Sequence, residues 1–130
     1  MIVLDASVVV EFLTNGPLAD AIRDDLAGRG ESLVVPHLLD IEVVNAIRSL
    51  TAGQRIGADR AELILSRLVS LPAERVPHLA LLPRIWELRR NFTAYDATYI
   101  ALAEAMDATL YTSDKRLAKG HRARVVVFAN

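Results

Sequence analysis

The chain has 130 residues, of which 52% are hydrophobic and 24% are charged, and this composition excludes a disordered protein. It contains no cysteine, so disulfides, thiol nucleophiles and zinc–thiolate sites are excluded. The net charge of −1 does not decide for or against a nucleic-acid partner, because the distribution of charge matters more than its sum. We expect one domain over residues 1–130, with no membrane span and no secretory signal, and therefore a cytoplasmic protein.

The first predicted element is a strand at Ile2–Leu4, a short β-branched run that is typical of the buried centre of a parallel sheet. Short apolar strands then alternate with helical patterns along the chain. Pro77 indicates an edge strand, and Pro83 should break or offset the helix around it. The predicted helices cover residues 8–13, 17–26, 38–52, 56–71, 79–90 and 96–106, and the further strands cover 33–35, 74–77, 109–112 and 124–128. This alternation predicts a three-layer α/β fold with helices on both faces of the sheet.

Four acidic residues fall where these strands end or where helices begin against the sheet, and they are Asp5, Glu42, Asp96 and Asp114. Ligands of open α/β sheets bind at the carboxyl ends of the strands. A charged side chain in such apolar surroundings is costly to bury unless another group compensates it. A hard divalent cation with oxygen ligands is the natural compensation, so the pattern indicates metal-assisted phosphoryl chemistry.

Each acid also has a purely structural interpretation. Asp5 could cap the helix that follows it, and Glu42 could be an acid favoured by the helix dipole. Asp96 could be an N-cap or first-turn residue, and Asp114 has the surroundings of a helix N-cap, which is the better interpretation of that residue alone. The joint placement of the four at one edge of one sheet favours the metal site.

Four segments together resemble PIN domains and, within them, the VapC toxins of type II toxin–antitoxin systems: Ile2–Ser7, Glu42–Ala46, Tyr95–Ala103 and Leu110–Asp114. The resemblance covers essentially the whole chain in the same order. It implies a five-stranded parallel sheet in the order 3-2-1-4-5 and a Mg²⁺- or Mn²⁺-dependent endoribonuclease that a VapB antitoxin silences. By position it implies that Asp5, Glu42, Asp96 and Asp114 form the metal site, that Ser7 and Thr112 hold a carboxylate or a water, and that Asn45 supports Glu42.

In the expected mechanism, Asp5 and Asp96 hold the ion while Glu42 positions or deprotonates its water, which leaves a 5′-phosphate and a 3′-hydroxyl on the products. Basic residues near Asp96 and Asp114 would contact flanking phosphates or form a solvated surface. Tyr95 could stack on a base, whereas Trp86 is expected in the core. The basic residues are Arg84, Arg89, Arg90, Lys115, Arg116, Lys119, Arg122 and Arg124, and the histidines without an expected role are His37, His78 and His121.

Specific residues argue against two other functions. A haloacid-dehalogenase-type phosphatase needs a second aspartate at position 7, where Ser7 stands, and a receiver domain needs an aspartate where Pro77–His78 follow the third strand. A nuclease outside a toxin–antitoxin pair and a non-catalytic protein-binding module stay open as alternatives. The helices over residues 38–71 are more apolar than one sheet face requires, so we also expect a homodimer.

Overall fold

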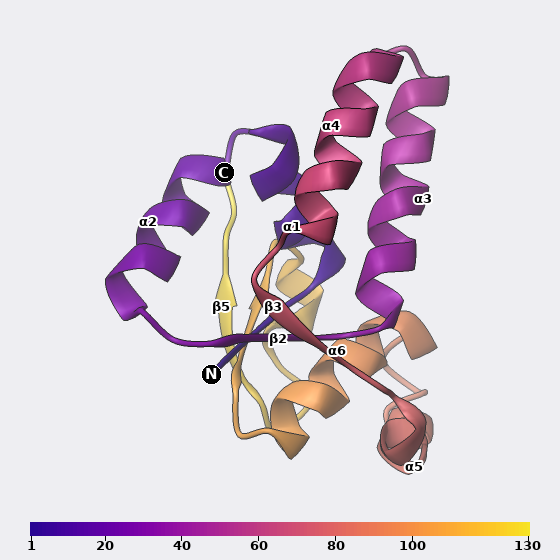
Figure 1. The fold of residues 1–130 in the computed structure, drawn as a ribbon. Helices are drawn as coiled ribbons and strands as arrows, with labels where there is room; N and C mark the ends of the chain where they lie inside the picture. Colours follow the sequence, from indigo (N-terminus) through magenta and orange to yellow (C-terminus); the bar gives the residue numbers. More distant parts are fainter.

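The computed structural model describes residues 1–130 and contains a five-stranded parallel sheet in the order β3-β2-β1-β4-β5 (Figure 1). This order confirms the prediction. The strands are β1 Ile2–Leu4, β2 Leu33–Pro36, β3 Ala73–Val76, β4 Thr109–Thr112 and β5 Arg124–Val127. Because the strands are parallel, their carboxyl ends meet at one edge of the sheet, and β1 lies at its centre.

The helices follow the predicted pattern, with shifted ends. They are α1 Ala6–Thr14, α2 Ala19–Arg29, α3 Leu38–Ala52, α4 Ala58–Val69, α5 Leu82–Glu87 and α6 Ala94–Ala105, with short 3₁₀ helices η1 Leu79–Leu81 and η2 Lys115–Ala118. The single helix expected over 79–90 is η1 followed by α5, since Pro83 is tolerated only in a first turn. Helix α6 begins earlier than expected because Thr93 caps it, its hydroxyl accepting from the Asp96 amide at 3.2 Å.

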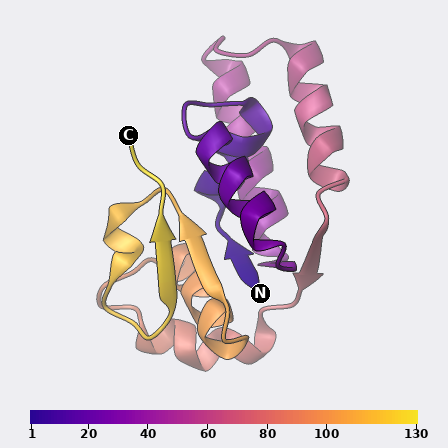
Figure 2. The ribbon, with the colours of Figure 1, turned by 90° about the vertical axis from the view of Figure 1, so that its left-hand side faces the viewer.

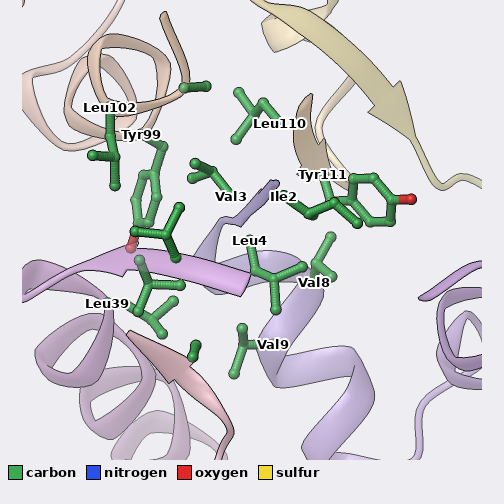
Figure 3. Packing of buried hydrophobic residues seen from close by; sticks show 14 of the residues in the cluster. Ile2, Val3, Leu4, Val8, Val9, Leu39, Tyr99, Leu102, Leu110 and Tyr111 are labelled. Atoms are coloured by element: carbon green, nitrogen blue, oxygen red, sulfur yellow. The ribbon is translucent and has the colours of Figure 1, made fainter. Parts of the chain in front are cut away.

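Helices cover both faces of the sheet, as Figures 1 and 2 show, with α6 against β1, β2 and β4 and with α1 and α2 on the other side. Side chains of β1 alternate between these two layers. In Figure 3, Val3 lies toward Tyr99 and Leu102 of α6, whereas Leu4 lies toward Val8 of α1. All three β1 side chains are buried, so the first strand is the centre of the core. None of the helices has the length and apolar character that a membrane span needs.

Helices α3 and α4 form a hairpin that extends beyond the sheet (Figures 1 and 2). Arg75 of the edge strand β3 links this hairpin to the sheet. Its guanidinium donates to the carbonyls of Leu68 at 2.6 Å and Leu71 at 2.8 Å, and it pairs with Asp40 of α3 at 3.1 Å. The start of α3 is thereby fixed beside the carboxyl edge of the sheet.

Candidate metal site at the carboxyl edge of the sheet

Asp5 is the most buried of the four acids, with 5% of its surface exposed. It follows β1 directly and caps α1, because its Oδ1 accepts from the Val8 amide at 3.1 Å and from the Ser7 hydroxyl at 2.6 Å. Burial raises the pKa of Asp5, and the charge of Asp96 raises it further, while hydrogen bonds from Ser7, Thr112 and Val8 oppose the shift. Asp5 is thus both a helix cap and a carboxylate that has no cationic partner.

Glu42 and Asp96 stand on two helices that begin at the same edge. Glu42 lies in the second turn of α3, and its Oε1 accepts a hydrogen bond of 2.5 Å from the Tyr99 hydroxyl. Asp96 lies in the first turn of α6. Burial raises the pKa of both carboxyls; the charges of Asp96 and Asp5 raise that of Glu42 further, and the charge of Asp114 raises that of Asp96. Three elements far apart in the sequence therefore bring three carboxylates into mutual repulsion.

Asp114 differs from the other three because it has its own cation. Its carboxylate accepts from the Arg116 amide at 2.9 Å and from the guanidinium at 2.7 Å, and it caps η2. The hydrogen bond with Arg116 lowers the pKa of Asp114. The interpretation of Asp114 as an N-cap is confirmed by the hydrogen bond from the Arg116 amide. The charge of Asp114 nevertheless reaches Asp96, so it borders the same cluster.

Of the three residues predicted to support the acids, Ser7 and Thr112 form hydrogen bonds at this edge and Asn45 does not. The Ser7 hydroxyl donates to Asp5 and accepts from the Ser113 amide at 3.0 Å, which joins the end of β1 to the end of β4. The Thr112 hydroxyl accepts from the Asp114 amide at 3.0 Å. Asn45 is exposed and forms no hydrogen bond with Glu42. The sequence pattern did not single out Tyr99, which supplies that contact instead.

The donor chemistry of this edge fits a hydrated divalent cation. Asp5, Glu42 and Asp96 offer only carboxylate oxygens, which suit Mg²⁺ and Mn²⁺. No three acidic or imidazole side chains come close enough together to enclose a cation by themselves. Mg²⁺ usually keeps several waters and binds through one or two carboxylates, so a two-carboxylate site with water ligands fits these residues.

Three of the arginines considered as phosphate contacts or as solvated surface lie away from the four acids. Arg84 pairs with Glu104 of α6 at 2.7 Å, and the Arg122 amide donates to the same carboxylate at 2.8 Å. Arg124 starts β5 and pairs with Asp107 at 2.9 Å. These contacts are at the amino ends of β4 and β5, opposite the acids. Of the two alternatives, contact with flanking phosphates does not fit these three, because sequence proximity to an acid does not tell which end of a strand a side chain occupies.

The prediction that Trp86 is a core residue was wrong. Trp86 is 67% exposed, and the Arg89 guanidinium lies over its ring at 4.5 Å. The short helix α5 buries none of its own residues, so Trp86 remains outside. Tyr95 is 60% exposed next to Asp96, where a base could stack on it. Both ring nitrogens of His121 contact backbone groups, the Leu117 carbonyl at 2.7 Å and the Ala123 amide at 3.1 Å.

The chain is similar to known proteins over nearly all of its length. Residues 2–122 match the PIN domain family. The chain is 43% identical over 117 residues to ribonuclease VapC9 of Mycobacterium tuberculosis, covering 90% of this chain and 88% of the relative. It is 37% identical over 131 residues to ribonuclease VapC12 of the same species, covering 99% of this chain and 100% of the relative.

Solved structures share the fold at lower sequence identity. VapBC2 from Rickettsia felis, bound to a DNA fragment from its promoter, gives a TM-score of 0.75 at 14% identity and covers 98% of this chain and 99% of that one. FitAcB from Neisseria gonorrhoeae gives 0.69 at 18% identity, covering 96% of each chain. Sequence, sheet order and structural neighbours agree, and the chain belongs to the PIN-domain family, among its VapC ribonucleases.

Proposed function

We propose that this protein is a Mg²⁺- or Mn²⁺-dependent endoribonuclease that acts in the cytoplasm as the toxin of a VapBC-type toxin–antitoxin pair. The observation that most supports this proposal is the repulsion among Asp5, Glu42 and Asp96, whose pKa values are all raised although the charge of Arg116 acts against the shift of Asp96. Unneutralised carboxylates in a partly buried site destabilise a fold, so they indicate that a cation binds there. The relatives with the highest identities reported above carry the name ribonuclease.

In the proposed site, Asp5 and Asp96 would hold the ion, Glu42 would act on its water, and Asp114 would add negative charge beside it. Ser7 and Thr112 orient the acids nearest to them. A bound Mg²⁺ or Mn²⁺ supplies charge neutralisation at the phosphate and lowers the pKa of water. Glu42, whose own pKa is raised, is suited to accept a proton from the attacking water. Asp5 is held by the Ser7 hydroxyl and the Val8 amide, so the edge of the sheet orients the reacting groups.

Cleavage of RNA by the purified protein tests the reaction. We expect cleavage with Mg²⁺ or Mn²⁺ and none with EDTA, and the products should carry 5′-phosphate and 3′-hydroxyl ends because a water attacks the phosphorus. The matched control is Asp59→Asn, which removes an exposed first-turn acid of α4 far from the sheet edge. Cyclic phosphate ends, or cleavage that continues in EDTA, would contradict the proposed mechanism.

The antitoxin and the dimer are proposed on exposed apolar surface. Large apolar side chains are exposed on the α3–α4 hairpin, including Ile41 at 69% and Val69 at 82%, and a second group surrounds α5, including Leu79 at 73% and Trp86. Surfaces of this kind are typical of protein interfaces. Neighbours in structure include toxin–antitoxin complexes. We propose a homodimer that also binds a VapB-type antitoxin.

Coexpression separates this function from the alternatives. Expression of the chain alone should arrest growth, and coexpression with the antitoxin encoded beside it should relieve the arrest. A nuclease outside a toxin–antitoxin pair would cleave RNA without this relief. A protein-binding module would neither cleave RNA nor respond to Asp5→Asn. Sedimentation of a monomer at micromolar concentration would contradict the dimer.

A further inference from the structure

Tyr99 donates a hydrogen bond to the carboxylate of Glu42, and its ring is buried in the core. It stands on α6 one turn after Asp96 and is 2% exposed. Figure 3 shows the ring between Val3, Leu102 and Leu39, with its oxygen at the margin of the cluster. The hydroxyl donates to Glu42 Oε1 at 2.5 Å across 57 positions of sequence. A ring packed in this way has a fixed orientation, which fixes the position of its hydroxyl oxygen.

The phenol is a permanent donor at this site. A phenol is protonated at neutral pH, so the Tyr99 hydroxyl has a proton to donate to the Glu42 carboxylate. The bond is also the only hydrogen bond that the Glu42 carboxylate receives. Asp5, by contrast, is held by two partners of its own segment.

Glutamate has three side-chain torsions and loses much rotamer freedom when it is held in one place. Repulsion from Asp5 and Asp96 also favours conformers in which Glu42 turns away from the cluster. The Tyr99 hydroxyl donates to Oε1 from a fixed position, which opposes both the rotamer freedom of Glu42 and its repulsion from the other acids. The second carboxylate oxygen, Oε2, stays free to face the sheet edge. Helix α6 thus carries Asp96 itself and positions Glu42 of α3 through the hydrogen bond from Tyr99.

We propose that Tyr99 is the positioning residue of the metal site, holding Glu42 toward Asp5 and Asp96 by its buried hydroxyl. The inference rests on the proposed function, since it assumes that Glu42 serves the ion. Residues that orient a metal-site carboxylate typically contribute a factor of about 10 to 100 in metal affinity. Tyr99 does not touch the substrate in this assignment and acts only through Glu42.

The test is Tyr99→Phe, which keeps the packed ring and removes the hydroxyl. We expect Mn²⁺ affinity, measured by titration calorimetry without RNA, to fall about 10- to 100-fold. Tyr111→Phe is the matched control. Tyr111 is also buried, and its hydroxyl also bonds a carboxylate, that of Asp25 on α2. In Figure 3 its ring and hydroxyl lie on the opposite side of the cluster from Tyr99. The control should bind Mn²⁺ like the wild type.

A double-mutant cycle separates positioning from general loosening of the core. In a Glu42→Ala background, Tyr99→Phe should have no further effect on Mn²⁺ affinity, because the group it acts through is gone. Wild-type affinity in Tyr99→Phe, or an undiminished further loss in the Glu42→Ala background, would overturn the proposal.

A crystal structure of metal-free Tyr99→Phe tests the same inference without any cation. Glu42 should occupy more than one rotamer there, and a single wild-type rotamer would overturn the proposal. If wild-type protein does not bind Mn²⁺ at all, the proposed function fails. This rotamer comparison still decides whether Tyr99 holds Glu42.

Discussion

The inner acids Asp5, Glu42 and Asp96 and the outer acid Asp114 occupy one edge of the sheet in opposite electrostatic conditions. The pKa of each inner carboxyl is raised, first by burial and then by the charges of other acids. The pKa of Asp114 is lowered, first by its hydrogen bond to Arg116. An acid whose own chain already neutralises it has less to gain from a metal ion than one that stands in repulsion.

This difference shows that the position of an acid at the end of a strand does not decide whether its carboxylate is free to bind a metal ion. Asp5 and Asp114 both follow strands and both cap the next helical turn. Only Asp114 is followed two residues later by an arginine, Arg116, whose guanidinium pairs with the carboxylate at 2.7 Å. To bind an ion, Asp114 must exchange Arg116 for that ion.

Loss of activity should show the largest difference. Asp5→Asn and Asp96→Asn should each lower the rate of RNA cleavage at least ~10²-fold, the scale of a lost catalytic group. Asp114→Asn should lower the rate by a smaller factor, because Asp114 is partly committed to Arg116. Single-turnover cleavage of one RNA at saturating Mn²⁺ measures all three. Equal losses in the three variants would erase the distinction between inner and outer acids.

Stabilisation by Mn²⁺ should separate the acids next. A ligand at a hundredfold excess over its Kd stabilises a protein by about 2.7 kcal/mol, which at about 3 °C per kcal/mol raises the melting temperature by about 8 °C. Thermal unfolding with and without Mn²⁺ should give this rise in the wild type and a much smaller one in Asp96→Asn. Asp114→Asn should keep most of the rise. A wild type that does not respond to Mn²⁺ would leave these acids without a common site.

Without metal, the two substitutions should change stability in opposite directions. Asp96→Asn removes a repelled charge, so its melting temperature in EDTA should be slightly higher than that of the wild type. Asp114→Asn keeps a capping side chain but breaks the exposed ion pair with Arg116, so its melting temperature in EDTA should be slightly lower than that of the wild type. Arg116→Gln is the control, since it removes the pair and keeps the cap. A lower melting temperature for Asp96→Asn would indicate that Asp96 is structural.

The smallest expected effect is in the pH dependence of these differences. The folded-state pKa of Asp96 lies above its usual 3.8, so the folded protein binds more protons than the unfolded chain and loses stability as pH rises through that pKa. The advantage of Asp96→Asn in EDTA should therefore grow as the pH rises above about 4. The pKa of Asp114 lies below 3.8, so its contribution is lost as pH falls through it. The deficit of Asp114→Asn should thus shrink only in acid, and a parallel pH trend for both variants would contradict the assignment.

Local sequence determined much of this protein. The β-branched run at Ile2–Leu4 and the Pro77 that follows β3 were sufficient to predict the central and edge strands, because strand and turn preferences act over a few residues. The four acids were singled out in the same way, since each lies within a few residues of the end of a strand or the start of a helix. The sheet order came from the resemblance to PIN domains and not from periodicity.

Tertiary structure decided which neighbours each side chain has. Arg84 and Arg124 are near acids of the site in sequence but pair with Glu104 and Asp107 at the opposite end of the sheet. Trp86 lies in an apolar stretch but remains exposed, since its short helix buries none of its residues. The bond between Tyr99 and Glu42 joins two helices across 57 positions, and no local pattern encodes it. Propensities and periodicity report on a residue's own turn or strand, whereas contacts, burial and pKa shifts arise only when distant elements pack together.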